Sequence, residues 1–269
     1  MANLMYQLPT DNLAATGTLT VQSGTEDTAY SKANIYDGNP AKPAKLTTTT
    51  GAWRWDFGSA KQLDIVAVIH HNLTAGLNVR IQGNATDAWG APSLDQAFMI
   101  PANHEDGMPV NPWLDLSALV PIAGNRTFQF WRLVVVGVNA AAVAIGDVWL
   151  GQTKRQMAIN IHWGLEETDE HPVVEHETSH KVQTVYDLNT KVRKIAGEVE
   201  TTDAGASDLL AWHRACSGRV KLTLVVLDPS KNDCLLARWM APELAVQRNF
   251  KNSNLVKLGW QELSRGMPF

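Results

Sequence analysis

The residue types with the clearest potential for catalysis lie in the second half of the chain. His176, Glu177 and His180 form the pattern His-Glu-x-x-His. On a helix this spacing places both imidazoles on one face, where they can bind zinc, and the glutamate beside them can activate a water molecule. A third ligand would be expected downstream, and Glu198 and Glu200 lie at suitable separations. One hypothesis is therefore a zinc hydrolase.

The residues around this pattern favour a strand over a helix. No apolar positions accompany the two histidines at helical spacing, and side chains alternate in character from Val182 to Leu188. In a strand, positions four apart lie about 13 Å apart at ~3.3 Å per residue, which is too far for one metal ion. We therefore expect a solvated turn followed by a strand, and we predict no metal site, no cofactor and no catalytic residue.

A second candidate site lies in the first half, where His70, His71 and Asn72 end an apolar stretch. Aromatic rings and polar side chains that converge on one place are typical of carbohydrate sites. The candidate sugar-binding residues are Trp53, His71, Asn72 and Trp89. The alternative is that the tryptophans fill the core and the other residues make strand-end hydrogen bonds. The sequence favours this alternative, because apolar burial decides the position of most tryptophans.

The bulk composition excludes several classes of protein. The chain has 269 residues, a net charge of −4 and 45% hydrophobic residues, which is typical of a globular protein without a basic surface for nucleic acid. The apolar run of residues 133–145, which Gly137 and Asn139 interrupt, is shorter than the ~20 residues that a membrane helix needs. Cys216 and Cys234 are too few for a disulfide framework, so we expect thiols and a reducing compartment. The N-terminal residues have neither the basic nor the apolar region of a secretory signal.

The first half of the chain is predicted to be a succession of short strands. Alternating or continuous apolar residues are bounded by glycine, proline and asparagine, and no helical period appears before Gly151. The predicted strands are residues 16–24, 53–57, 63–71, 78–83, 128–138 and 144–150, with a short strand or turn at 113–119 and irregular chain at 88–104. The last two strands are expected to close the sheet as a pair. This is the pattern of an antiparallel sandwich or jelly roll.

The second half is predicted to be a separate β-rich domain. The net charge of −4 comes from residues 1–152, which contain 8 basic and 12 acidic residues. Residues 153–269 contain 15 of each and have no net charge. We therefore predict domains of 1–152 and 153–269. One helix is predicted at about 204–217, with Thr202, Asp203 or Ser207 as its cap and Gly218 as its end. The predicted strands are 154–162, 181–188, 192–201, 219–227, 234–240, 244–250 and 255–263, and 164–177 is expected to be acidic and rich in turns.

Five stretches of the first half resemble, in order, a discoidin-type, galactose-binding-like jelly roll. They are Asn-Ile-Tyr-Asp-Gly at 34–38, Trp-Asp-Phe-Gly at 55–58, the apolar stretch 63–72, Trp-Arg-Leu at 131–133 and Ile-Gly-Asp-Val-Trp-Leu-Gly at 145–151. The resemblance covers about residues 30–151 and implies a sandwich whose end loops can contact sugars. Extracellular discoidin domains are commonly clamped by a terminal cysteine pair. This region has no cysteine, which fits a protein folded in a bacterial cytoplasm.

The second half resembles the tail-tube-like and distal tail proteins of long-tailed bacteriophages. The resemblance rests on a β-rich layer with a single helix and on the closing residues 261–267, Gln-Glu-Leu-Ser-Arg-Gly-Met. It implies a structural virion protein of the tail tip or baseplate, folded in the host cytoplasm, that forms a hexameric ring by self-association. The implied partners are other copies of the chain, the tail tube, hub and tape measure proteins, and host-surface carbohydrate.

The leading hypothesis is a mainly β, non-enzymatic tail protein. It combines an N-terminal antiparallel jelly-roll β-sandwich with a C-terminal tail-tube-like β domain that contains one helix. A stand-alone carbohydrate-binding module is the alternative, and a zinc hydrolase is the third hypothesis.

Overall fold

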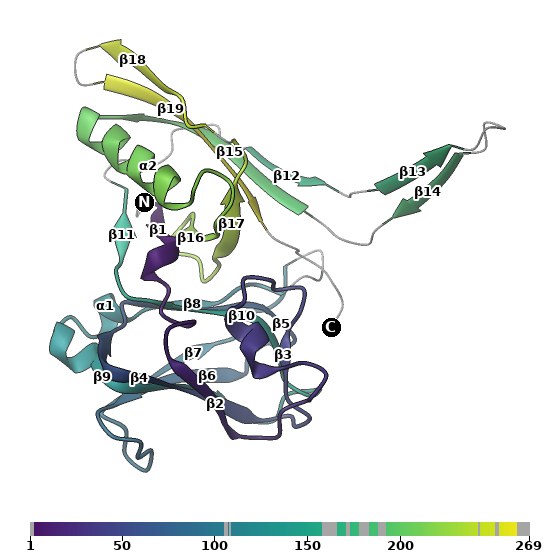
Figure 1. The fold of residues 1–269 in the computed structure, drawn as a ribbon, viewed down its shortest axis with the longest axis vertical. Coiled ribbons are helices and arrows are strands. Elements are labelled where there is room, and N and C mark those ends of the chain that lie inside the picture. The colour runs from purple at the N-terminus through teal and green to yellow at the C-terminus, as the bar shows by residue number, and fades with distance from the viewer. Residues whose placement is uncertain are drawn as a thin grey trace. The chain divides into compact units, whose positions relative to one another are not determined.

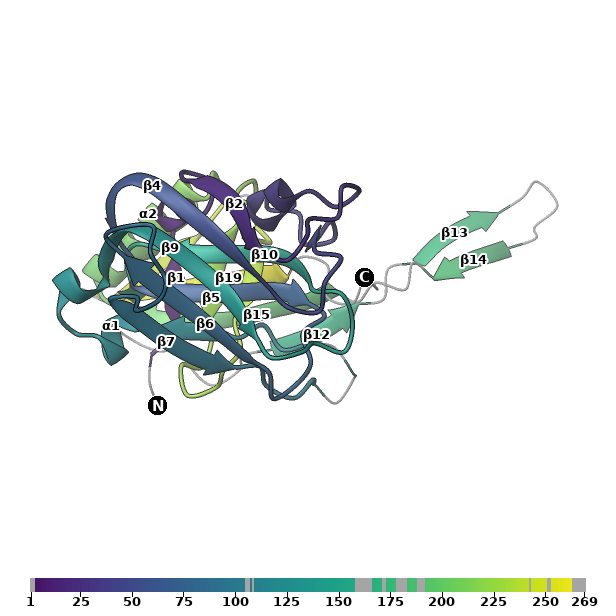
Figure 2. The same cartoon turned by 90° about the horizontal axis from the view of Figure 1, so that it is seen from below.

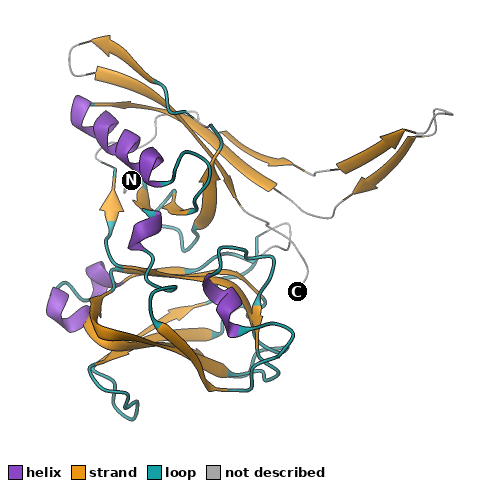
Figure 3. Cartoon of the chain, in the orientation of Figure 1, coloured by secondary structure: helices purple, strands orange, loops and turns teal. Residues whose placement is uncertain are grey.

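The structure is a computed structural model of the chain, drawn as a ribbon in Figure 1. It describes residues 3–104, 107, 109–157, 166–170, 173–177, 183–187, 192–241, 243–250 and 253–262. The described chain consists mainly of antiparallel strands, with one helix of several turns and a few short ones (Figure 3). The prediction of a mainly β fold is confirmed.

Two compact units make up the chain. Unit 1 contains Met1–Met157 together with Leu222–Leu236, and unit 2 contains Ala158–Lys221 together with Ala237–Pro268. The chain therefore leaves unit 1 after Met157 and returns to it for a short segment. The prediction of two consecutive domains that meet at residue 152 stays a prediction.

Unit 1 contains a sandwich of two antiparallel sheets. The first sheet has five strands in the order β2 (Thr18–Ser23), β4 (Gly51–Gln62), β9 (Thr127–Val136), β6 (Asn78–Asn84) and β7 (Leu94–Met99). The second has four strands in the order β3 (Ala44–Lys45), β10 (Ala144–Gly151), β5 (Ile65–His71) and β8 (Trp113–Asp115). Figure 2 shows the strands of the five-stranded sheet side by side.

The core of the sandwich lies between these two sheets. Trp53, Trp55 and Trp131 are fully buried in it, and Trp55 stands directly opposite Trp131 on the neighbouring strand. Aliphatic side chains from both sheets complete this core, among them Val66, Val68, Val79, Ile81, Leu133, Ile145, Val148 and Leu150. Because side chains alternate along a strand, the residues between these positions on β4, β6 and β9 point away from the core.

The predicted closing pair of strands is wrong in its pairing. β9 and β10 form close to the predicted positions, but they belong to different sheets. β9 pairs with β4 and β6, whereas β10 pairs with β3 and β5. The connection between them therefore crosses from one sheet of the sandwich to the other. Local patterns identify a strand, but its partners depend on residues far away in the sequence.

The outer face of the four-stranded sheet is also apolar, and it is covered within unit 1. The residues of β5 alternate between the sandwich core and a second apolar cluster. The second cluster consists of Met5, Ile65, Ala67, Ile69, Trp113, Trp149, Leu224, Val226, Cys234 and Leu236. In this cover, β1 (Met5–Gln7) pairs with both β11 (Arg155–Gln156) and β16 (Thr223–Val226). The cover is therefore built from three distant parts of the sequence.

One buried glutamine ties this cover to the sheet beneath it. Gln7 Oε1 accepts a hydrogen bond from Trp149 Nε1 at 2.8 Å, and Gln7 Nε2 donates to the carbonyl of Thr153. The Thr223 hydroxyl donates to the main-chain carbonyl of Gln7 at 2.5 Å. Because the buried carboxamide is bonded at both ends, the cost of removing it from water is compensated.

Unit 2 is built around two long strands, β15 (Val192–Thr201) and β19 (Ser253–Glu262), which pair along most of their length. β12 (Glu166–Glu170) pairs with β15. β18 (Val246–Phe250) and the C-terminal part of β17 (Leu235–Trp239) pair with β19. These elements form one antiparallel layer.

The predicted helix is confirmed as α2 (Asp203–Ala215). It begins where the Thr202 hydroxyl accepts a hydrogen bond from a main-chain N–H of the first turn, and two residues with positive φ follow its end. The helix buries Trp212, whose ring centroid lies 4.8 Å from that of Trp239 and 5.4 Å from that of Trp260. These aromatic contacts fix the helix on the layer of unit 2.

Two other expectations from the sequence are wrong. Residues 88–104, expected to be irregular, contain β7, and residues 164–177, expected to be turns, contain β12 and β13 (Val173–Glu177). β7 pairs with β6 along its whole length. Charged residues do not exclude a strand at the edge of a sheet, where they discourage unwanted pairing.

The strand β13 pairs with β14 (Gln183–Asp187) as a hairpin, and the two form a sheet of their own in the described chain (Figure 2). The remaining elements are short helical turns: η1 (Pro9–Asp11), η2 (Lys32–Tyr36), α1 (Leu116–Leu119) and η3 (Ala123–Arg126). Cys216 and Cys234 are buried thiols that form no disulfide, as the sequence predicted. No described helix is long and apolar enough to cross a membrane.

Replacing Gly151 with alanine is expected to destabilise unit 1 by roughly 1–3 kcal/mol. An added Cβ would overlap with the Gln7 carboxamide, which cannot move without losing its bonds to Trp149 and Thr153. Gly124→Ala is the matched control, because no atom lies within 4 Å of the Cβ that it would add. Urea denaturation measures both variants, and equal stability of the two would contradict the prediction.

Candidate functional site

The structure separates the four residues that the sequence named as candidate sugar contacts. Trp53 lies on the inner side of β4 and is 0% exposed, so neither face of its ring is accessible to a ligand. His71 and Asn72 lie at the end of β5, and Trp89 lies in the loop between β6 and β7. Of the two tryptophans, Trp89 is the one whose ring is partly exposed.

His71 and Asn72 use their polar atoms inside the protein. The main-chain N–H of Leu73 donates to His71 Nδ1 at 3.1 Å, so the ring proton sits on Nε2, which lies 3.0 Å from the carbonyl oxygen of Val110. The His71 side chain is 2% exposed, and burial lowers its pKa to about 4. Asn72 bonds to the main chain at the start of β10 and in the loop before it. These contacts hold the end of β5 to its neighbouring loops.

Trp89 belongs to a cluster of polar side chains on the outer face of the five-stranded sheet. Its indole Nε1 donates to Asp87 Oδ1 at 2.8 Å, and the guanidinium carbon of Arg132 lies 4.5 Å from its ring centroid. Asp87 in turn forms an ion pair with Arg54. Contacts with an arginine of β4 and an arginine of β9 thus hold the loop between β6 and β7 against the sheet.

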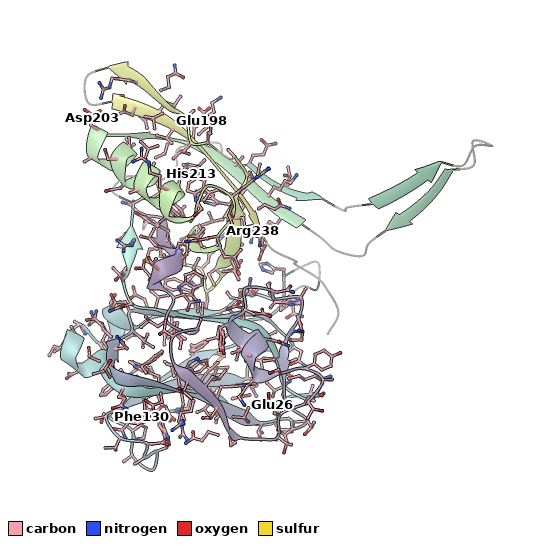
Figure 4. All side chains as sticks on the ribbon, viewed as in Figure 1. Glu26, Phe130, Glu198, Asp203, His213 and Arg238 are labelled. Carbon is pink, nitrogen blue, oxygen red and sulfur yellow. The ribbon has the colours of Figure 1, made fainter. Side chains whose placement is uncertain are left out.

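The backbone register places these arginines in one row across the sheet. The successive cross-strand partners on β2, β4, β9, β6 and β7 are Thr20, Arg54, Arg132, Gln82 and Asp95. The neighbours of the two arginines along their own strands belong to the sandwich core, so the row faces outwards. Phe130, labelled in Figure 4, lies on the same face, and its ring centroid is 5.7 Å from the guanidinium carbon of Arg54.

Hydrogen bonds hold the arginine side chains of this row in place. Arg132 Nε donates to Gln82 Oε1 at 2.6 Å, and Arg132 Nη1 donates to Gln22 Oε1 at 2.9 Å. Arg54 Nε donates to the Thr20 hydroxyl at 3.0 Å. Both guanidinium groups are therefore oriented before any ligand arrives.

The charges on this face are only partly balanced. Arg80 pairs with Asp95 at 2.7 Å, and this bond raises the pKa of Arg80. Burial acts to raise the pKa of Asp95, but hydrogen bonds from Arg80 and Gln82 outweigh it and lower that pKa. The pKa of Arg132 is lowered, because the effect of burial outweighs the longer-range attraction of Asp95 and Asp87, which acts to raise it. Arg132 also stands directly opposite Arg54, and like charges in this position destabilise a sheet.

We call this set of side chains the Trp89–Arg132 face; its members are Trp89, Asp87, Arg132, Arg54, Gln22 and Gln82. A partly exposed indole can stack on the apolar side of a small polar molecule. Oriented guanidinium groups can donate to the polar edge of that molecule, and the carboxylate of Asp87 can accept from it. The face therefore suits reversible binding of a polar ligand.

Sequence reasoning named one member of this face, Trp89, and missed the others. The available signal was the repetition of an arginine between two apolar residues, as Trp-Arg-Trp on β4, Val-Arg-Ile on β6 and Trp-Arg-Leu on β9. Alternation predicts that all three arginines point away from the core. The missing information was the register that brings two of them opposite each other.

The His-Glu-x-x-His pattern does not begin on a helix. His176 and Glu177 lie at the end of β13, opposite Thr184 and Gln183 on β14, and His180 lies outside the described residues. Within the described ranges, no group of three His, Cys, Asp or Glu side chains is close enough to hold a metal ion. The strand at His176 and Glu177 contradicts the helical geometry that the zinc hypothesis requires.

A buried carboxyl lies on the strand that pairs with β5. Asp147 is almost fully buried, and its Oδ2 accepts a hydrogen bond from the main-chain N–H of Gly38 at 3.1 Å. Burial raises the pKa of Asp147 well above its usual value, and the nearby carboxyl of Asp37 adds to this effect. The hydrogen bond from Gly38 lets Asp147 hold the turn that contains Gly38 in place. Because the Asp147 carboxyl is buried, it cannot contact a substrate.

No protein-family model matches the chain, and no curated protein sequence matches it. Among solved structures, a Streptococcus pneumoniae fucose binding module is similar over 53% of this chain and 98% of its own, with 13% identity and a TM-score of 0.38. The lectin domain of lectinolysin, complexed with Lewis B antigen, matches 54% of this chain and 98% of its own, with 12% identity and a TM-score of 0.39. Chitosan-binding module 1 of a chitosanase/glucanase from a Paenibacillus species matches 51% and 96%, with 15% identity and a TM-score of 0.37. Fucose, Lewis B antigen and chitosan are ligands named for these similar proteins.

Replacing His71 with glutamine is expected to remove part of the acid sensitivity of unit 1. An unfolded histidine has a pKa of 6.5, whereas buried His71 has a pKa of about 4, so protonation favours unfolding as the pH falls between these values. Over this interval the wild type should lose up to about 3 kcal/mol of unfolding free energy that the variant does not lose. Urea denaturation at neutral and acidic pH measures the difference. Parallel pH dependence of the two proteins would contradict the prediction.

Proposed function

We propose that the chain is a non-catalytic protein that binds carbohydrate through the Trp89–Arg132 face. Sugar sites combine an aromatic ring, which stacks on C–H groups of the sugar, with oriented polar groups that bond its hydroxyls. Trp89 supplies such a ring, Arg132 and Arg54 supply donors, and Asp87 supplies an acceptor. The observation that carries the proposal is the partly exposed indole of Trp89 held 4.5 Å from an oriented guanidinium.

The affinity of such a site depends on how much conformational freedom its side chains lose when the ligand binds. Immobilising a flexible side chain costs about 0.5–1.5 kcal/mol. The bonds of Arg132 to Gln82 and Gln22 already hold that side chain in the absence of ligand. The strands beneath it carry fully buried tryptophans and do not need to move. An open sheet face covers less of a ligand than a pocket does, so we expect moderate and readily reversible binding.

We also propose that the chain assembles with copies of itself as a structural component of a phage tail tip. The observation that favours this proposal is the β13–β14 hairpin, which pairs with no third strand in the described chain. An isolated hairpin of two strands is at best marginally stable in water. No other strand of the described residues pairs with its outer edges, which carry main-chain hydrogen-bonding groups. Pairing with a neighbouring copy would address both problems.

In this second proposal the assembly is a ring, hexameric as in the tail proteins that the second half resembles. The virion would be assembled in the bacterial cytoplasm, with the tail tube, hub and tape measure proteins as neighbours. Unit 1 would then contribute the contact with carbohydrate on the host surface. The two proposals are therefore compatible and can be tested separately.

Replacing Trp89 with alanine is expected to weaken sugar binding about tenfold or more, because truncation of a central aromatic contact typically costs ~2 kcal/mol. The matched control is Tyr30→Ala, since Tyr30 is a 37% exposed ring with a cation, Lys45 Nζ, 5.2 Å from its centroid, and it does not belong to this face. A glycan array identifies a ligand, and isothermal titration calorimetry measures its affinity. An array without any bound glycan, or equal losses in both variants, would overturn the proposal.

Deleting the hairpin is expected to convert an oligomer into a monomer. The variant joins Glu170 to Val192 through a short Gly-Ser linker, which removes both hairpin strands and keeps β12 and β15. Sedimentation velocity compares the two proteins, and circular dichroism shows whether the variant keeps its fold. A wild type that stays monomeric at high concentration, or a folded variant that still assembles, would count against self-association.

A further inference from the structure

We infer that the ligand of the Trp89–Arg132 face carries one isolated negative charge, so that the preferred ligand is an acidic saccharide containing a uronic or sialic acid. The inference rests on the carbohydrate-binding function proposed above and narrows its ligand class. It comes from a difference between Arg132 and the two other arginines on the same sheet.

Two of these three arginines have carboxylate partners. Arg54 pairs with Asp87, and Arg80 pairs with Asp95. Arg132 lies between them in the sheet, directly opposite Arg54, yet its side-chain hydrogen bonds go to two neutral amides. Among the described residues, no carboxylate lies within ion-pair distance of its guanidinium. The positive charge of Arg132 is therefore held in a half-buried position without a direct counter-charge.

Arg132 also has hydrogen-bond donors to spare. A guanidinium carries five N–H donors, and the bonds to Gln82 and Gln22 use two of them. A carboxylate can accept two parallel bonds from the guanidinium fork, which makes this pairing both strong and directional. An anionic ligand would thus use the spare donors and neutralise the charge in the same contact.

The neighbouring carboxylates limit this ligand to a single charge. Asp87 and Asp95 lie close enough to act on Arg132 through longer-range attraction. A nucleic acid or a sulfated polysaccharide has closely spaced charges and needs several unpaired cations, but Arg54 and Arg80 already have partners. The two aspartates would repel such a polyanion, whereas they can accept hydrogen bonds from sugar hydroxyls. A sugar with one carboxylate fits both features.

The position of Trp89 fits a ligand of this size. The guanidinium carbon of Arg132 lies over the indole, 4.5 Å from its centroid, and so covers one face of the ring. A single monosaccharide at the edge of this stacked pair can touch both groups. One residue of the ligand can therefore supply the apolar contact to Trp89 and the carboxylate to Arg132. A neutral sugar would make the first contact but leave the second unmade.

The test compares each of two acidic sugars with a neutral counterpart, and in the second pair the two sugars differ only in the group at C6. Isothermal titration calorimetry with the full chain measures 3′-sialyllactose against lactose, and methyl glucuronide against methyl glucoside. The acidic member is expected to bind about tenfold tighter or more, and the difference should shrink at high salt. Equal affinities within both pairs would overturn the inference and leave the proposed function standing. Binding of no sugar, together with an empty glycan array, would overturn the proposed function and the inference with it.

Variants of Arg132 locate the preference. Arg132→Gln is expected to bring the affinities for the acidic and neutral sugars within about threefold of each other, while Arg132→Lys keeps the charge and should keep part of the preference. Lys45→Gln is the matched control, because it removes a cation that lies 5.2 Å from the ring of Tyr30, outside this face. Thermal unfolding shows that each variant is folded. An acidic preference that survives in folded Arg132→Gln, or tighter binding of heparin or single-stranded DNA than of 3′-sialyllactose, would overturn the inference.

Discussion

The four-stranded sheet of unit 1 is apolar on both faces, and the rest of the unit depends on this constraint. Every residue of β5 and β10 is buried. Leaving either face in water would cost roughly 25 cal/mol for each Å² of exposed apolar surface. One face packs on the five-stranded sheet, and β1 and residues 222–236 cover the other. Gln7, bonded to Trp149 and to Thr153, holds this cover in a defined position. The N-terminal strand β1 and residues 222–236, which are far apart in the sequence, are thus both needed to complete unit 1.

This arrangement gives the two sheets of the sandwich different roles. The four-stranded sheet is covered on its outer side by apolar side chains, whereas the five-stranded sheet carries a row of polar residues there. Two arginines face each other in that row, which is unfavourable by itself. Asp87, the indole of Trp89 and two glutamines compensate for this at defined positions, and they fix the direction of both guanidinium groups. Because their neighbours already hold the side chains of Arg54 and Arg132, these side chains need little reorganisation when a ligand binds.

Local patterns in the sequence were sufficient for most elements and insufficient for their pairing. Continuous apolar runs predicted β5 and β10, and helical spacing between a cap and a glycine predicted α2, since each depends on neighbours along the chain. The pairing of β9 with β4 and β6 depends on residues tens of positions away, so the expected pair of β9 and β10 was wrong. The same limit applied to the site. Alternation in Trp-Arg-Trp already places Trp53 and Arg54 on opposite faces of β4, but no local pattern shows that Arg54 meets Arg132. Trp89 lies in a loop without a period, and its contacts could be found only in three dimensions.

Weak recognition by unit 1 and self-association through the hairpin would strengthen each other. A single open face on a sheet is expected to hold a sugar loosely, because it removes only part of the ligand from water. If several copies are joined, the second and later contacts become intramolecular, and the overall affinity for a surface can exceed that of one site by about 10²–10⁴. This gain needs no new contact at Trp89 or Arg132, but it requires that the sugars be spaced so that several copies engage at once. A binding face of modest affinity is therefore consistent with a protein that acts in a ring, and it would allow single contacts to exchange while the assembly stays attached.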